Sequence, residues 1–233
     1  ELQRYFGICE PLTTENCDDI FDKCNAILNS DDRTVRNIIK KSNVDTICTT
    51  DDPVDSLEWH KAIKADTSFD VTVLPAWRPD KAMNIEKPTF GSYIAKLEAV
   101  TASNIRTFAD LKKALISRME FFDSMGCKVS DHGLNYVTYC PASEAEIDII
   151  LAKKLGGSEV TKEEELKFKT EFMLFMGRQY SKFGWIMQLH YGAKRDNNTK
   201  MFNKLGPDTG YDAINNYAPA AELADFLNAL NAT

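Results

Sequence analysis

Apolar residues occur along the chain in two kinds of segment, short continuous runs and longer stretches with helical spacing. Continuous runs are typical of strands buried in a sheet, and an i, i+3, i+4 spacing is typical of amphipathic helices. The runs predict strands over 44–50, 69–77, 126–131 and 185–190. The helical spacing predicts helices over 14–28, 34–41, 55–65, 90–100, 108–125, 143–155, 161–183 and 219–230. This alternation predicts an α/β fold in which helices lie outside a parallel sheet.

Several residues mark where the predicted helices begin and end. Ser143-x-x-Glu146 and Thr161-x-x-Glu164 have the capping-box pattern that opens a helix. Gly126 and Gly184 each stand just before a strand, where glycine readily closes a helix in the left-handed conformation. The best loop candidates are 29–32, 81–89 and 206–216. No internal repeat or low-complexity linker divides the 233 residues.

The charge balance and the cysteines limit the function classes. The net charge is -7, which argues against a nucleic-acid partner because phosphate binding needs a basic surface. No apolar run approaches the roughly 20 residues of a membrane span, and no signal peptide is recognisable, so we expect a cytoplasmic protein. The six cysteines form no C-x-x-C pattern, which predicts free thiols. Cys17 and Cys24 are seven apart, so we expect both in the core on one helix face.

Polar side chains follow each predicted strand, and they form the candidate site. Because the carboxyl ends of parallel strands meet at one edge, these side chains should converge there. They are Asp52 after the first strand, Arg78 and Lys81 after the second, Asp131 and His132 at the end of the third, and His190 and Arg195 at or after the fourth.

Each candidate also has a simpler interpretation. The polar residues could be ordinary solvated loops. Arg78 could form an ion pair with Asp51, Asp52 or Asp80 instead of gripping a carboxylate ligand. His190 could be a core histidine satisfied by backbone. No G-x-S-x-G or H-E-x-x-H occurs, and the segment 206–210 has turn composition without the spacing of a phosphate loop.

Long ungapped segments at 49–60, 73–85, 126–137 and 184–214 resemble the uronate isomerase (glucuronate isomerase) family of the amidohydrolase superfamily. The resemblance covers essentially the whole chain. It implies a distorted (β/α)8 barrel that uses a divalent metal, commonly zinc. It also implies an aldose–ketose isomerase, which interconverts D-glucuronate with D-fructuronate and D-galacturonate with D-tagaturonate.

The resemblance further implies that this chain is an interior portion of such an enzyme. The family's H-x-H metal pair is absent from the chain, and the four predicted strands would be the second to the fifth of the barrel. We therefore expect one partial barrel domain over 1–233, with 1–43 a helical segment before the first strand. Asn135, Lys194 and Asp196 depart from the family pattern, which puts local substrate contacts in doubt.

On this resemblance, Asp131, His132 and His190 are the predicted catalytic residues. Asp52, Arg78, Lys81 and Arg195 are the predicted substrate-binding residues. His190 is a tentative metal ligand, with the main ligands expected outside this chain. The expected partners are a small uronate substrate and either a second copy or the remainder of the barrel, with no nucleic acid and no membrane.

Two other functions stay open at this point. One is a metal-dependent hydrolase of the same superfamily, which would share the metal-binding edge without needing a carboxylate clamp. The other is a non-catalytic half-barrel that binds sugar acids.

Overall fold

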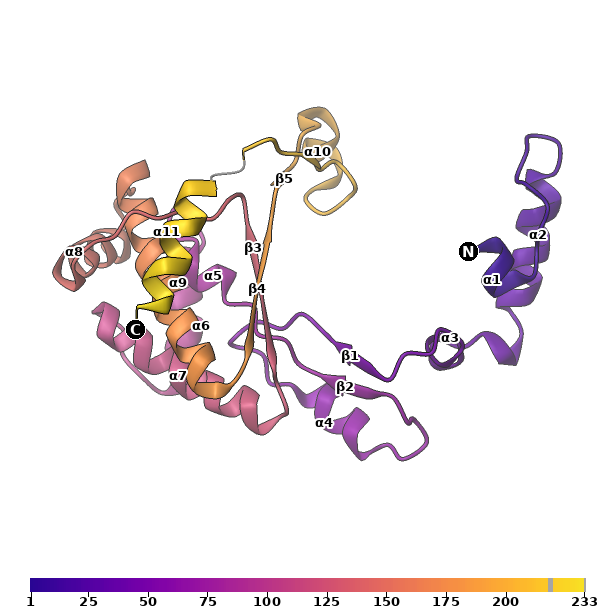
Figure 1. The fold of residues 1–233 in the computed structure, drawn as a ribbon, viewed down its shortest axis with the longest axis horizontal. Coiled ribbons are helices and arrows are strands. Elements are labelled where there is room, and N and C mark those ends of the chain that lie inside the picture. The colour runs from indigo at the N-terminus through magenta and orange to yellow at the C-terminus, as the bar shows by residue number, and fades with distance from the viewer. Residues whose placement is uncertain (218–219, 233) are drawn as a thin grey trace. The chain divides into compact units, whose positions relative to one another are not determined.

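The computed structural model describes residues 1–217 and 220–232, and it alternates helices with short strands (Figure 1). The helices are α1 (Leu2–Phe6), α2 (Cys17–Leu28), η1 (Asp31–Arg33), α3 (Val35–Lys41), α4 (Glu58–Ala65), α5 (Asp80–Met83), α6 (Phe90–Thr101), α7 (Phe108–Ser124), α8 (Glu144–Leu155), α9 (Lys162–Phe183), α10 (Thr199–Leu205) and α11 (Ala220–Asn231). The strands are β1 (Thr46–Cys48), β2 (Thr72–Leu74), β3 (Val129–Leu134), β4 (Ile186–Tyr191), β5 (Ala193–Lys194) and β6 (Ala213–Ile214). The chain is therefore an α/β protein.

The predicted helix boundaries are confirmed where capping residues mark them. Ser143 and Thr161 each accept a backbone N–H three residues on, and each box is closed by its glutamate. Gly184 closes α9 with φ of 66°, a left-handed conformation that glycine adopts at low cost. Pro219, predicted to open the last helix, lies outside the described residues.

Contacts divide the chain into two compact units. The first comprises 1–47 and 59–73, and the second comprises 48–58 and 74–233. In the first unit, Tyr5 Oη lies 2.9 Å from Ser42 Oγ, and Arg36 donates to Asp66 over 2.6 Å. The region 1–43 contains α1, α2, η1 and α3. A single domain over 1–233 stays a prediction.

The sheet of the second unit is parallel. Strands β3 and β4 pair in parallel from Val129 with Ile186 to Leu134 with Tyr191. Single parallel bridges extend the order, one between Trp77 and Ser130 and one between Asp51 and Trp77. The carboxyl ends of these segments therefore point the same way, as the strand–helix alternation predicts.

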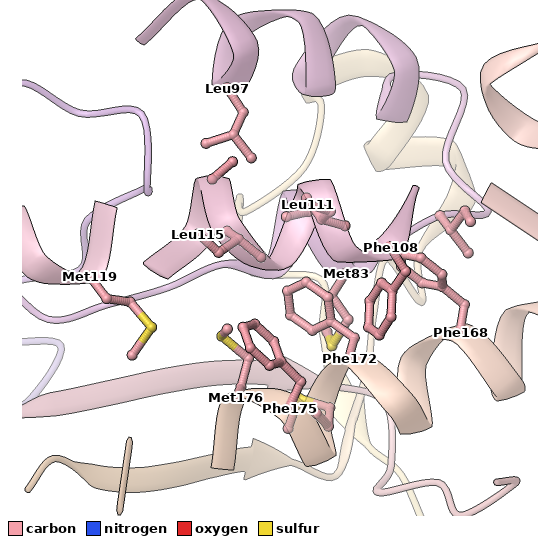
Figure 2. Close-up of a cluster of buried hydrophobic side chains, with 14 of the residues drawn as sticks. Met83, Leu97, Phe108, Leu111, Leu115, Met119, Phe168, Phe172, Phe175 and Met176 are labelled. Carbon is pink, nitrogen blue, oxygen red and sulfur yellow. The ribbon is translucent and has the colours of Figure 1, made fainter. Parts of the chain in front are cut away.

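The core of the second unit lies between the helices and the strands, and α9 is at its centre. Helix α9 contacts α5, α7, α8, α11 and β4, and in Figure 1 it lies beside α11. Figure 2 shows Phe168, Phe172 and Phe175 of α9 facing Phe108, Leu111 and Leu115 of α7. Phe168 and Phe172 have no exposed surface, and Phe108 packs edge-to-face on Phe168 with ring centroids 5.9 Å apart. This apolar packing holds the helices against the strands.

Several local predictions are wrong. The third strand runs to Leu134 rather than ending at Asp131. Residues predicted as loop at 81–89 and 206–216 include part of α5 and the short strand β6, and helix α10 was not predicted.

Burial also differs from the prediction in two places. The sulfhydryl side chain of Cys17 is exposed rather than in the core, because α2 buries only Ile20. One face of β4 is uncovered, and Ile186 is 69% exposed, although a continuous apolar run is typical of a strand buried on both faces. In the part of the chain that the structure describes, no helix is long and apolar enough to cross a membrane.

Two isoleucines of α8 test the packing. Ile147 has no exposed surface, whereas Ile149 is 67% exposed. We expect Ile147→Ala to lower the free energy of unfolding by about 2–5 kcal/mol, because it removes buried methylene groups and leaves a cavity. The matched control Ile149→Ala should change it by less than about 0.5 kcal/mol. Urea denaturation of both variants measures the difference, and equal losses would contradict this assignment of the core.

Candidate active site at the carboxyl ends of the strands

The parallel pairing brings polar side chains from three neighbouring segments to one edge of the sheet. Trp77 donates its backbone N–H to Val129 and accepts the N–H of Asp131, so Arg78 emerges beside β3. Asp131 is paired with Gln188 and Gly133 with His190, so the end of β4 lies next to them. Arg78, Asp131 and His190, predicted to converge, are thus brought together.

Arg78 lies between two carboxylates. Its Nε donates to Asp80 Oδ2 over 2.8 Å, and its Nη1 donates to Asp131 Oδ2 over 3.2 Å. Two of the three guanidinium nitrogens are therefore already engaged by carboxylates of this chain. The ion pair with Asp80, which the sequence left open as an alternative, is realised, and it occurs together with a contact to Asp131.

Asp131 links this ion pair to His190. Its Oδ1 lies 3.5 Å from His190 Nδ1, and Gln188 Nε2 approaches the same oxygen at 3.4 Å. The Asp131 side chain is 15% exposed and that of His190 is 51% exposed. A carboxylate beside Nδ1 favours the tautomer that carries its proton there, and it leaves Nε2 as the nitrogen that can accept a proton.

Asp52 and Lys81 form a second polar group at the same ends. Lys81 Nζ lies 3.0 Å from Asp52 Oδ2, and the buried Tyr93 of α6 donates its hydroxyl to Asp52 Oδ1 over 2.7 Å. The Lys81 side chain is 69% exposed, so its ammonium group is accessible. Burial, and then the charge of Asp52, raise the pKa of Tyr93, which keeps it a hydrogen-bond donor.

Arg195 follows β5 and borders a cavity of about 200 Å³. Its Nη1 lies 2.6 Å from Asp212 Oδ2 and 3.7 Å from Asp208 Oδ1. Gly133, which carries the backbone N–H bonded to Asp80, lines the same cavity. The cavity thus adjoins the Arg78 and Asp131 group, and Lys162 and Lys169 also line it.

His132 does not join this group, which corrects the expectation that Asp131 and His132 face one site. Both residues lie inside β3, and successive side chains of a strand point to opposite faces. His132 has no exposed surface, and its Nε2 lies 2.8 Å from Tyr180 Oη of α9. Burial, and then the charge of Arg78, lower the pKa of His132 to about 3, so it is neutral. This geometry does not support a direct acid–base role for His132.

Tyr93 and Tyr180 are partners that the sequence did not indicate, and Asp80 was indicated only as an alternative ion-pair partner of Arg78. Asp80 stands two residues after Arg78, so its proximity was a usable signal. Tyr180 is 48 residues from His132 along the chain. No local pattern reports such a contact, because it depends on how α9 packs on β3.

These residues do not test the metal prediction. Within 1–217 and 220–232, no three His, Cys, Asp or Glu side chains stand close enough to hold a metal ion together. His190 and Asp131 offer two donors, fewer than the three protein ligands of a typical catalytic zinc site. The described residues therefore do not fit a complete metal centre by themselves, and His190 as a ligand stays a prediction.

Comparison with known proteins shows which family the chain belongs to. The model of the family described as glucuronate isomerase matches residues 1–233. The chain belongs to this family. It is 59% identical over 233 residues to the uronate isomerase of Lachnoclostridium phytofermentans and 57% identical to that of Lachnospira eligens. In both comparisons the match covers all of this chain and 50% of the relative.

Solved structures agree with this family membership. The crystal structure of a uronate isomerase from Thermotoga maritima superposes with a TM-score of 0.87 at 32% identity, over 97% of this chain and 50% of that one. Glucuronate isomerase from Caulobacter crescentus superposes with a TM-score of 0.86 at 26% identity. The chain spans about half the length of the relatives and structures that it matches.

Burial of His132 predicts an acid-sensitive stability. The imidazole titrates near 6.5 in the unfolded chain and near 3 in the folded one, so the unfolded state binds the extra proton between these values. This contribution to stability is complete above pH 6.5 and is lost as the pH falls toward 3. We expect a loss of about 2 kcal/mol between pH 7.5 and pH 5.

Urea denaturation at both pH values measures this loss. His132→Gln should be less stable at pH 7.5 but should show a smaller pH dependence. An unchanged pH dependence in His132→Gln would argue against neutral burial of this imidazole.

Proposed function

We propose that this chain supplies strands and active-site residues to a uronate isomerase, as part of a (β/α)8 barrel. The observation that carries the proposal is a guanidinium, a carboxylate and an imidazole joined end to end at the carboxyl ends of neighbouring parallel segments. Active sites of parallel α/β folds are built at these ends. Membership of the glucuronate isomerase family supports an intramolecular isomerase as the class of enzyme.

The reaction is an aldose–ketose isomerisation. A proton leaves the carbon beside the carbonyl, giving an enediol, and returns to the neighbouring carbon. This requires a positioned base and a donor that stabilises the negative charge that develops on oxygen. His190 has the arrangement of an acid–base group, because Asp131 lies 3.5 Å from Nδ1 and the imidazole side chain is 51% exposed.

The uronate carboxylate and hydroxyls require separate partners. Two carboxylates already engage Nε and Nη1 of Arg78, so the guanidinium does not suit a two-point grip on the substrate carboxylate. Its third nitrogen, Nη2, suits a single hydrogen bond to a substrate oxygen. Arg195 and Lys81, whose side chains are 42% and 69% exposed, lie at the same ends and suit the carboxylate. A divalent metal ion would supply Lewis acidity to the substrate oxygens, and its main ligands would come from residues beyond those described.

The chain by itself should be inactive. Half of a barrel leaves the site open to water and lacks a complete metal ligand set among the residues described. We expect no detectable conversion of D-glucuronate by the purified 233-residue chain with added zinc, followed by NMR of the carbon-13-labelled sugar acid. Full-length uronate isomerase of L. phytofermentans is the positive control. Turnover by the chain alone would contradict this prediction.

Arg195 tests the carboxylate assignment. We expect the chain to bind D-glucuronate weakly and Arg195→Ala to raise the dissociation constant about tenfold, because an exposed charged hydrogen bond to the carboxylate is lost. Binding of D-glucose, which has no carboxylate, should change less than twofold. NMR titration measures both. The control is Arg106→Ala, at an arginine whose side chain is 67% exposed outside the site.

A hydrolase that needs no carboxylate grip would give a different result. In that case Arg195→Ala would weaken the uronate and the neutral sugar alike, and the isomerase assignment would lose its support from this residue.

A further inference from the structure

Asp80 connects the segment after β2 to the end of β3 with one oxygen. Its Oδ2 accepts Arg78 Nε over 2.8 Å and the backbone N–H of Gly133 over 3.1 Å. The carboxylate is 15% exposed, so both hydrogen bonds are largely shielded from water. A shielded hydrogen bond between charged groups fixes geometry more firmly than an exposed one.

Gly133 leaves the space in which the guanidinium lies. A Cβ atom built on this residue would stand 2.3 Å from Arg78 Nη2 and 2.9 Å from Asp80 Oδ2. Neither distance is compatible with van der Waals contact. Any larger residue at this position would therefore have to displace the guanidinium from Asp80 or from Asp131.

The position of Arg78 in turn sets that of Asp131. Arg78 Nη1 contacts Asp131 Oδ2, which leaves Oδ1 facing His190 Nδ1 at 3.5 Å. The five residues thus form one chain of contacts, from Gly133 through Asp80, Arg78 and Asp131 to His190. Removing the contacts of Asp80 with Gly133 and Arg78 should loosen the contact between Asp131 and His190, because each side chain is oriented by its neighbour.

The ion pair has features that stability alone does not explain. Asp80 Oδ1 is buried without a hydrogen-bond partner among the residues described, which is an unfavourable arrangement for a carboxylate. Burial also raises the pKa of Asp80, against the opposing effects of Arg78 and the Gly133 N–H. Retaining a charged group in such surroundings is typical of functional sites.

We infer that Asp80 and Gly133 are positioning residues of the uronate site. Asp80 anchors the guanidinium of Arg78, and Gly133 leaves room for it, so that Arg78 presents Nη2 to the substrate and holds Asp131 against His190. This inference rests on the proposed function, and it adds two residues that touch neither substrate nor metal in that proposal.

The first test follows Arg78 directly in the full 233-residue chain labelled with nitrogen-15. Asp80→Asn keeps the size of the side chain and an acceptor oxygen but removes the charge. We expect the Nε–H of Arg78 to exchange with water at least about tenfold faster in this variant, and Asp80→Ala to have a larger effect. Gly91→Ala, an exposed position of α6 with no atom within 4 Å of the new Cβ, is the matched control for a glycine substitution.

The second test measures binding of D-glucuronate. Gly133→Ala should raise its dissociation constant about tenfold, close to the effect of Arg78→Ala, because the displaced guanidinium no longer presents Nη2. Combining Gly133→Ala with Arg78→Ala should add less than twofold, since both changes remove the same contact. Gly91→Ala should leave binding unchanged.

The outcomes separate this inference from the proposed function. If Arg78→Ala weakens glucuronate binding while folded Asp80→Asn and Gly133→Ala chains bind normally, the positioning role is refuted and the proposed function stands. If neither Arg195→Ala nor Arg78→Ala affects binding, the proposed function fails. Should Gly133→Ala prevent folding, the exchange rate of Arg78 Nε–H in Asp80→Asn decides, and an unchanged rate would refute the inference.

Discussion

The parallel pairing at Trp77 is the constraint on which the candidate site depends. Trp77 is fully buried, and its backbone bonds to Val129 and Asp131 on one side while Asp51 bridges to it on the other. These backbone hydrogen bonds set the register of three segments. A shift of one residue would send Asp131 to the helix-facing side and His132 to the open side, because neighbouring strand residues face opposite ways.

The side-chain chemistry follows from that register. Asp131 faces Arg78 and His190, whereas His132 faces Tyr180 and the aromatic packing around it. Two adjacent polar residues thus have opposite roles, one in an ionic network and one as a neutral buried group. The difference in exposure, 15% for the Asp131 side chain against none for His132, decides which of them can meet a substrate.

The charge balance at the strand ends also limits what can bind there. Arg78 contacts two carboxylates, Lys81 contacts Asp52, and Arg195 contacts Asp212. An anionic ligand must therefore compete with these carboxylates for the cations. On the proposed function, the hydroxyls of a sugar acid would meet both donors and acceptors at this site, and one exposed cation would be enough for its carboxylate.

The sequence by itself determined the elements and the family. Apolar periodicity located the main helices, the capping boxes at Ser143 and Thr161 marked where two of them begin, and four apolar runs marked the main strands. These signals are local, so they can be recognised without knowing the fold. The convergence of Arg78, Asp131 and His190 was also predictable, since parallel strands end on one side.

Only the tertiary structure decided which atoms meet. The extension of β3 to Leu134 separates His132 from Asp131, and the packing of α9 supplies Tyr180 as its partner. The need for glycine at position 133 comes from the guanidinium of a residue 55 positions earlier, and the exposed face of β4 contrasts with its apolar sequence. Such features depend on contacts between residues far apart in the chain, for which local sequence patterns carry no signal.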